Sequence, residues 1–319
     1  MAQRSICILG GTGFVGRHLL SRLAEDGHTI KILTRRREQH RDLLVLPTVQ
    51  VVSTDIHDQQ QLAQQFAGCD TVINLVGILN ENHKKRGFEF VHVELPRKVV
   101  KACRTAGVKR LLHMSALGAD AAYAQSRYLR SKGEGENSAH NVYGLAVTSF
   151  RPSVIFGPDD SFINRFAGLL RRIPLAFPLA CPEARFAPVY VGDVAEAFAR
   201  SLDNRATFGK HFELCGPREY TLRQLVEFVA KGMGLKRRII GLGDSLSYLQ
   251  ARLLELAPGK PFTRDNYLSM QHPSVCKEGG LPRLFGIQAQ SLEAVMSRHL
   301  SGTNRSQRYS CMRRAARRN

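Results

Sequence analysis

Short apolar runs alternate with amphipathic stretches through the first half of the chain. The runs predict strands at Ser5–Leu9, Thr29–Leu33, Val49–Ser53, Thr71–Val76, Arg110–Met114 and Ala146–Ile155. Apolar residues at helical spacing predict helices between them, at Phe14–Asp26, Asp58–Ala67 and Phe88–Ala106. Nearly continuous apolar strands that alternate with helices are typical of a parallel sheet covered on both faces. We therefore expect an α/β fold with a Rossmann-type doubly wound parallel sheet.

Beyond Gly157 a series of prolines interrupts this rhythm. Regular elements then return, and we expect a strand at His211–Leu214 and helices at Asp193–Leu202, Leu222–Met233 and Ser245–Leu256. Asp193 and Thr221 are the expected N-caps of the first two helices. The pattern predicts a Rossmann domain over residues 1–157 and a small C-terminal substrate lobe over 158–301, interleaved with the sheet. Residues 302–319 contain six arginines and no acid, and we expect a disordered tail.

The charge balance is unusual for a chain of 319 residues, with a formal net charge of +19. Such a field attracts anions, whether a phosphorylated cofactor, an acidic partner or an anionic membrane. Nucleic acid is an unfavoured partner, because no recognisable binding module accompanies the charge. The seven cysteines are scattered without a C-x-x-C pair, which indicates free thiols in a reducing compartment. The histidines show no metal-like spacing, so we expect no metal site.

The N-terminus lacks the apolar segment of a signal peptide, and no stretch reaches the about 18 apolar residues of a transmembrane helix. We expect a cytoplasmic protein. A membrane association would be peripheral, at the inner face of the membrane.

A glycine-rich turn directly follows the first predicted strand and opens the first helix. Its residues are Gly10, Gly11, Thr12, Gly13, Phe14, Val15 and Gly16. Glycines here let the backbone turn tightly and approach a pyrophosphate, while the helix N-terminus faces the anion. A strand before the turn and a second strand at the right distance after it indicate a nicotinamide dinucleotide site.

The end of the second strand bears on the choice of cofactor. A site for NAD usually carries a carboxylate there for the ribose hydroxyl, whereas this chain has Thr34, Arg35 and Arg36. Guanidinium groups suit a 2′-phosphate. The sequence favours NADP(H), with NAD(H) as the alternative.

Two further strand ends are candidates for cofactor contact. Asp55 and Ile56 follow the third strand and could hold the adenine, although ordinary turn chemistry explains Asp55 equally well. The fourth strand ends in Asn74, Leu75, Val76 and Gly77, and its small residues would let the nicotinamide half lie close to the backbone.

Tyr128 and Lys132 lie four residues apart, which places both on one face of a helix. A nearby ammonium would lower the tyrosine pKa from about 10 and make Tyr128 an acid/base group for hydride transfer. The lysine could also bind ribose hydroxyls. A solvated helix face is the alternative reading of this pair.

Several motifs together resemble the extended or atypical short-chain dehydrogenase/reductases of the NAD-dependent epimerase/dehydratase superfamily. They are the glycine-rich turn, the Tyr128/Lys132 pair, Ile73–Ile78, His113–Ala119, Arg151–Pro158 and Val189–Ala195. The chain is most similar to the branch of the NAD(P)H-binding alpha-subcomplex subunit of mitochondrial complex I and its bacterial relatives. The resemblance implies that Met114, Pro152, Ser153 and Val154 contact the cofactor. It also makes Ser115 a candidate catalytic residue.

One position departs from the family pattern. Active extended members have Ser or Thr where this chain has Ala116, and a strand reverses side-chain direction between neighbours such as Ser115 and Ala116. The leading hypothesis is an NADP(H)-dependent oxidoreductase acting on a carbonyl or quinone-like substrate. The alternatives are a cofactor-binding accessory or assembly subunit of a respiratory or quinone-synthesis complex, and a sugar-nucleotide epimerase or dehydratase.

Overall fold

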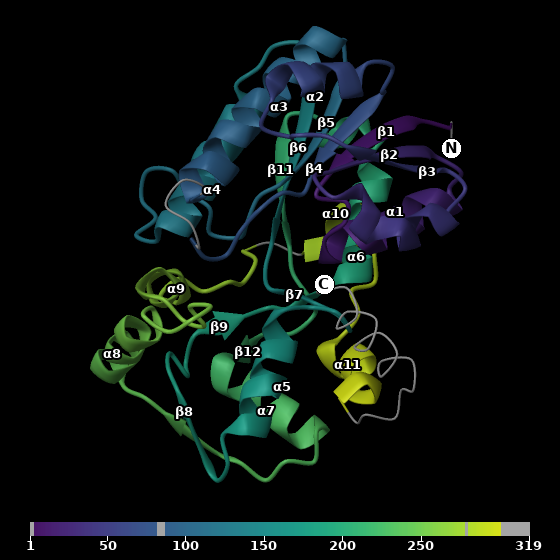
Figure 1. Ribbon diagram of the computed structural model, residues 1–319. Coiled ribbons are helices and arrows are strands. Elements are labelled where there is room, and N and C mark those ends of the chain that lie inside the picture. The colour runs from purple at the N-terminus through teal and green to yellow at the C-terminus, as the bar shows by residue number, and fades with distance from the viewer. Residues whose placement is uncertain (1–2, 82–86, 278–279, 301–319) are drawn as a thin grey trace.

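A seven-stranded parallel sheet forms the centre of the computed structural model, which describes residues 3–81, 87–277 and 280–300 (Figure 1). Its strand order is β11-β6-β5-β4-β1-β2-β3. The strands are β1 (Ser5–Leu9), β2 (Thr29–Thr34), β3 (Val49–Ser53), β4 (Thr71–Asn74), β5 (Arg110–Met114), β6 (Ala146–Pro152) and β11 (Lys210–Leu214). The expected Rossmann-type fold is confirmed.

Helices cover both faces of this sheet, as Figure 1 shows. One face carries α1 (Phe14–Glu25), α6 (Val191–Ser201) and α10 (Gly280–Phe285). The other carries α2 (Gln59–Phe66), α3 (Leu95–Ala106) and α4 (Arg127–His140). Each face has its own apolar core, because strands buried on both sides point alternate side chains to opposite faces.

A smaller lobe lies beyond the carboxyl ends of the sheet strands (Figure 1). Its helices are α5 (Phe162–Arg172), α7 (Leu222–Gly232), α8 (Asp244–Leu254), α9 (Arg264–Met270) and α11 (Leu292–Leu300). Its strand pairs are β7 (Ile155–Phe156) with β10 (Val189–Tyr190), β8 (Ala176–Leu179) with β13 (Arg238–Gly241), and β9 (Arg185–Phe186) with β12 (Tyr220–Thr221). A third apolar cluster, which includes Phe156, Phe177 and Val226, fills this lobe. Because α6 and β11 return to the main sheet, the two units interleave along the chain.

Three local expectations need correction. The apolar run Ala146–Ile155 divides into β6 and β7 rather than forming one strand. The stretch before α3 is a turn of π-helix, η2 (Glu89–Glu94), rather than α-helix. Asp193 is not an N-cap, because α6 begins at Val191 and the Asp193 carboxylate accepts the Gln290 N–H at 2.8 Å. By contrast, Thr221 caps α7 in a reciprocal capping box, as expected.

Short 3₁₀ segments complete the described elements, at η1 (Arg37–Val45) and η3 (Arg205–Thr207). No helix among the described residues is long and apolar enough to cross a membrane. The basic tail, residues 302–319, lies outside the described part of the chain.

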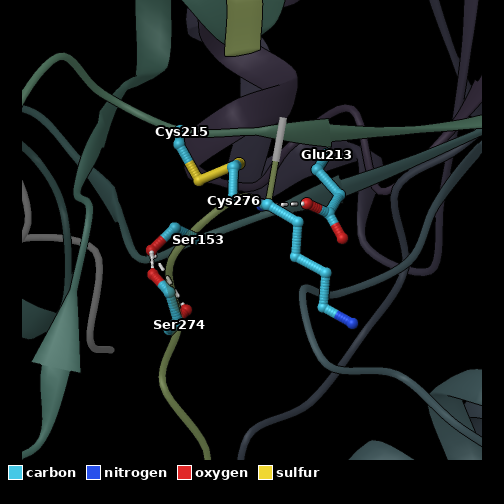
Figure 2. Close-up of a disulfide and its surroundings, with 6 residues drawn as sticks. Ser153, Glu213, Cys215, Ser274 and Cys276 are labelled. Carbon is cyan, nitrogen blue, oxygen red and sulfur yellow. Dashed lines mark hydrogen bonds between the residues drawn. A yellow bond between two sulfur atoms is a disulfide. The ribbon is translucent and has the colours of Figure 1, made fainter. Parts of the chain in front are cut away.

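The expectation of free cysteines throughout is wrong for one pair. Cys215 and Cys276 form a disulfide between the residue after β11 and the segment that leaves α9 (Figure 2). Beside it, the Ser153 hydroxyl donates to the Ser274 carbonyl at 2.7 Å, and the Lys277 N–H donates to Glu213 at 2.9 Å. These contacts join the chain after α9 to the carboxyl edge of the sheet. Cysteines 61 residues apart give no sequence signal for pairing.

Candidate functional site

The glycine-rich turn has the backbone geometry that the sequence predicts. Gly10 lies in the left-handed region with φ of +78°, and the Gly13 N–H donates to its carbonyl at 3.0 Å. A Cβ on Gly16 would lie 2.5 Å from the Gly10 oxygen and the Gly11 Cα, so only glycine fits there. No side-chain hydrogen bond caps the N-terminus of α1 in the described chain. Its first amides are therefore available to an anion such as a diphosphate.

A cleft of ≈ 530 Å³ opens between the carboxyl ends of the strands and the small lobe. It brings together a majority of the expected site residues, namely Gly10, Gly13, Phe14, Val15, Gly16, Leu75, Gly77, Met114, Ser115, Tyr128, Lys132, Pro152, Ser153 and Val154. Residues from the glycine-rich turn, the ends of β4, β5 and β6, and the helices α1 and α4 thus share one cavity, although they are spread over more than 140 positions of the chain.

The other expected cofactor residues do not line this cleft. Arg35 and Arg36 are exposed just after β2, and the Arg36 N–H donates to the buried Thr34 hydroxyl at 3.4 Å. Asn74 serves its own strand end, since its amide oxygen accepts the Val76 N–H at 3.2 Å. The remaining ones are Thr12, Asp55, Ile56 and Val76, of which Asp55 accepts the N–H of residue 57 in a local turn.

Lys132 is a buried lysine that faces the floor of the cleft. Its Nζ donates to the Met114 carbonyl at 3.0 Å, and a Cβ on Gly77 would lie 3.1 Å from that nitrogen. Burial lowers the pKa of Lys132 to about 8. An ammonium with this pKa is still mainly protonated near neutral pH and can lose its proton in mildly basic solution.

Tyr128 differs from the sequence expectation. Burial, followed by the negative charge of Asp265, raises the pKa of its phenol to about 12. The expected lowering of this pKa is therefore wrong for this chain, because burial and the Asp265 charge both act in the opposite direction. Tyr128 accordingly keeps its proton throughout the neutral range.

Ser115 is the side chain whose surroundings point most directly to a ligand. It is 3% exposed, it lines the cleft, and its hydroxyl has no hydrogen-bond partner among the described residues. A buried hydroxyl without a partner costs about 1–3 kcal/mol, which a ligand oxygen in the cleft would recover. Ala116 lines the same cleft and offers no polar atom. Of these two neighbours, Ser115 is therefore the one that can hydrogen-bond a ligand in the cleft.

A carboxylate of the small lobe holds the N-terminus of the helix that carries Tyr128 and Lys132. Asp265 accepts the Arg127 N–H at 2.6 Å, the Tyr128 N–H at 3.1 Å and the Ser126 hydroxyl at 3.0 Å. A negative charge at this position also interacts favourably with the helix dipole. Sequence reasoning missed Asp265, because a contact between residues 138 positions apart leaves no local pattern.

A buried histidine lies, like Lys132, next to Gly77. His92 accepts the Ile78 N–H on Nε2 at 3.0 Å, and its Nδ1 lies 2.9 Å from the Ser131 hydroxyl. Burial, with a contribution from the Lys132 charge, lowers the pKa of His92 to about 2. His92 is therefore neutral and fixes the backbone that follows Gly77.

The walls of the cleft change in character along its length. Ser115, Tyr128 and Lys132 gather at the end formed by the sheet. The small lobe supplies mainly apolar side chains, among them Phe162, Phe166, Phe186, Phe262 and Met270. Among the described residues, no group of His, Cys, Asp or Glu side chains is arranged to hold a metal ion. The arrangement suits an apolar molecule that carries one reactive oxygen.

Comparison with known proteins gives a consistent result. Residues 6–215 match the model of the NAD dependent epimerase/dehydratase family. The rat mitochondrial protein named NADH dehydrogenase [ubiquinone] 1 alpha subcomplex subunit 9 is 31% identical over 309 residues, which cover 92% of this chain and 79% of the relative. The ceramide reductase of Caulobacter vibrioides is 31% identical over 251 residues, 76% of this chain and 75% of the relative.

Two solved structures illustrate the fold. The structure titled gox2253 has a TM-score of 0.76 at 20% identity and covers 99% of this chain and 100% of its own. MoeE5, solved in complex with UDP-glucose and NAD, has a TM-score of 0.71 at 18% identity, with 95% and 99% covered.

Proposed function

This chain belongs to the NAD dependent epimerase/dehydratase family, and we propose that it is an NADP(H)-dependent oxidoreductase acting on the carbonyl group of an apolar substrate. The observation that carries the proposal is the unpartnered Ser115 hydroxyl, buried in the same cleft as Tyr128, Lys132 and the glycine-rich turn. If the cleft bound no ligand, the buried Ser115 hydroxyl would remain without a hydrogen-bond partner, which is unfavourable.

The residues around the turn fit a nicotinamide dinucleotide. The uncapped amides at the start of α1 would hold the diphosphate, and Gly16 keeps the helix close enough for this. Arg35 and Arg36, exposed after β2 with no carboxylate in that place, would bind a 2′-phosphate. Lys132 would donate to the ribose hydroxyls near Gly77.

The chemistry divides simply between cofactor and chain. A bound reduced nicotinamide would supply a hydride to the carbonyl carbon, which leaves negative charge on the substrate oxygen. Tyr128, whose pKa of about 12 keeps it protonated, donates its proton to that oxygen, so the product is an alcohol. The Ser115 hydroxyl donates a second hydrogen bond to the same oxygen, and the buried Lys132 ammonium holds the cofactor ribose in place beside it.

Tyr128→Phe tests the catalytic assignment. Removing the proton donor should lower kcat by about 10²–10⁴-fold, while the affinity for NADPH measured by calorimetry stays within about twofold. Unchanged kcat in this variant would remove Tyr128 from the mechanism. In the wild type, the rate of reduction should fall as pH rises through about 8, because Lys132 then loses its proton. The ionisation of Tyr128 lies too high to contribute to this profile.

Arg35→Ser combined with Arg36→Ser tests the cofactor preference. Loss of two guanidinium groups should weaken NADPH binding by about tenfold or more and leave NADH binding unchanged. Arg171→Ser with Arg172→Ser, an exposed pair at the end of α5, is the matched control for general charge. Equal loss for both cofactors would contradict a 2′-phosphate site.

A cofactor-binding accessory subunit is the second candidate function. It is favoured by the name of the rat relative, which is a subunit of NADH dehydrogenase, and by Ala116 beside Ser115. This function predicts tight cofactor binding without turnover of any carbonyl or quinone offered. Turnover of a free substrate that is lost in Tyr128→Phe would decide for the enzyme.

A further inference from the structure

Helix α8 of the small lobe turns its apolar side chains outward. Leu246, Leu249 and Leu253 are 55%, 48% and 61% exposed, and Leu256, just past the helix, is 84% exposed. Spacings of three and four residues place these leucines on one face. The residues that α8 buries are Ser247 and Ala251, both small. The helix is therefore amphipathic with its apolar face toward the surroundings.

The apolar surface continues beyond the helix. Tyr248 on α8 and Ile240 on β13, the strand that leads into α8, are 42% and 44% exposed. Leu175, before β8, is 83% exposed and its carbonyl accepts the Arg238 N–H at the start of β13. In Figure 1, α8 and β8 lie at the outer edge of the small lobe, away from the main sheet. Exposed apolar side chains on a strand pair and on the helix that follows it are typical of an interaction site on a protein.

Exposed basic residues lie at the β8–β13 end of this surface. They are Arg171, Arg172, Lys236 and Arg238. Two hydrogen bonds keep these segments together, from Arg237 Nε to the Leu170 carbonyl at 3.2 Å and from Arg238 N to Leu175 at 2.9 Å. Of the two acids at the ends of α8, Glu255 pairs with Arg264, and Asp244 accepts the Tyr267 hydroxyl and keeps its charge at the helix N-terminus. The surface is thus apolar with a positive border.

We infer that this surface docks on an anionic lipid bilayer, with α8 lying in the plane of the interface. The outward leucines would insert at the acyl boundary of the bilayer, and the neighbouring arginine and lysine side chains would bind the anionic headgroups. A second copy of the chain fits less well, because it carries the same net charge of +19 and offers no anionic surface to the basic border. A helix of 11 residues lies on a membrane and does not cross it.

The position of α8 connects this surface to the cleft. The rings of Tyr248 and Tyr267 are in edge contact with centroids 5.4 Å apart, so α8 packs directly on α9. Asn266 and Met270 of α9 line the cleft. A bilayer at α8 would therefore lie one helix away from the apolar end of the cavity. The docking itself goes beyond the proposed function and does not depend on any turnover.

A tryptophan reporter tests the docking surface directly, because the chain contains no tryptophan. We would place a single one at Leu249→Trp in the full chain and mix the protein with phosphatidylcholine vesicles, with or without phosphatidylglycerol. The emission should shift to shorter wavelength and be quenched by acyl-brominated lipid when phosphatidylglycerol is present. Tyr143→Trp is the control, since Tyr143 is 100% exposed and lies on the main unit, between α4 and β6. Its emission should not change.

A second variant measures affinity without adding a probe. Leu249→Ser with Leu253→Ser should weaken binding to the phosphatidylglycerol vesicles in flotation by about 100-fold, with Tyr143→Ser binding as the wild type. Circular dichroism checks that the variant is folded. Equal binding of the double variant and the wild type would overturn the proposal and assign any binding to charge elsewhere in the chain. A blue shift of Leu249→Trp on concentration without lipid would also overturn it, in favour of a second copy.

Discussion

The main unit and the small lobe use similar helices in opposite ways. In α1, Leu19, Leu20 and Leu23 are fully buried against the sheet. In α8, three leucines at comparable spacing face outward, while Ser247 and Ala251 face the protein. A row of leucines therefore identifies the apolar side of a helix, but it does not show whether that side packs against the core. The large sheet needs helices to cover it, whereas the small lobe leaves one helix free for another surface.

Reduction of the disulfide is expected to have the largest effect. The Cys215–Cys276 disulfide closes a loop of about 60 residues that includes α7, α8 and α9. A crosslink over such a loop stabilises the folded chain by up to about 4 kcal/mol. Urea unfolding of the oxidised protein with and without reductant measures this difference. Cys276→Ser should behave as the reduced wild type, and insensitivity of the wild type to reductant would show that the bond contributes nothing.

Leu20→Ala is expected to have the next largest effect. It would leave a cavity between α1 and the sheet where the side chain is 0% exposed, at a cost of about 3 kcal/mol in the free energy of unfolding. Urea denaturation checks the value. A loss under 1 kcal/mol would mean that the core under α1 can collapse around the deletion.

Asp265→Asn tests the contact by which the small lobe holds α4. Loss of the charge should cost about 1 kcal/mol of stability and lower the pKa of Tyr128, since Asp265 is one of the two causes that raise it. Ultraviolet titration, compared with Tyr128→Phe, identifies that tyrosine. Glu38→Gln is the control for loss of a carboxylate charge, because Glu38 is exposed and pairs with Arg41 rather than with a tyrosine. An identical tyrosine titration in Asp265→Asn and the wild type would contradict the electrostatic coupling.

Leu249→Ala is expected to have the smallest effect. Truncating an outward side chain should change the free energy of unfolding by less than about 0.5 kcal/mol. Measuring Leu20→Ala and Leu249→Ala under the same urea conditions compares a buried leucine directly with an outward one. A loss near that of Leu20→Ala would mean that α8 is packed and unavailable for docking.

The sequence predicted the main sheet well because buried parallel strands leave a clear trace. β1, β3 and β5 have the expected bounds, since each is an apolar run flanked by turn residues. The small lobe was harder. Strands such as β9 and β12 are two residues long, too short to show any alternation. The exposure of the α8 leucines could not be predicted either. A helical period shows which residues share a face of the helix, but not whether that face packs against the protein or points to solvent.

The same distinction applies to the site. Gly10, Gly13, Gly16, Ser115, Tyr128 and Lys132 could be named in advance because each belongs to a local motif, and all of them line one cleft. The Asp265 contact and the disulfide could not, because each joins segments far apart in the chain. The pKa of Tyr128 was misjudged because spacing on a helix reveals neither the burial nor the Asp265 charge that raise it.

The uniform direction of the seven strands has a consequence for how this molecule can diversify. All strands end on one rim, where both the glycine-rich turn and the small lobe are found. Segments inserted at that rim can be lengthened or exchanged without disturbing a single rung of the backbone ladder. Segments at the opposite rim lie away from the cleft, so changes there do not alter its lining. The glycine-rich turn and the small lobe therefore occupy the same rim of the sheet but can vary separately.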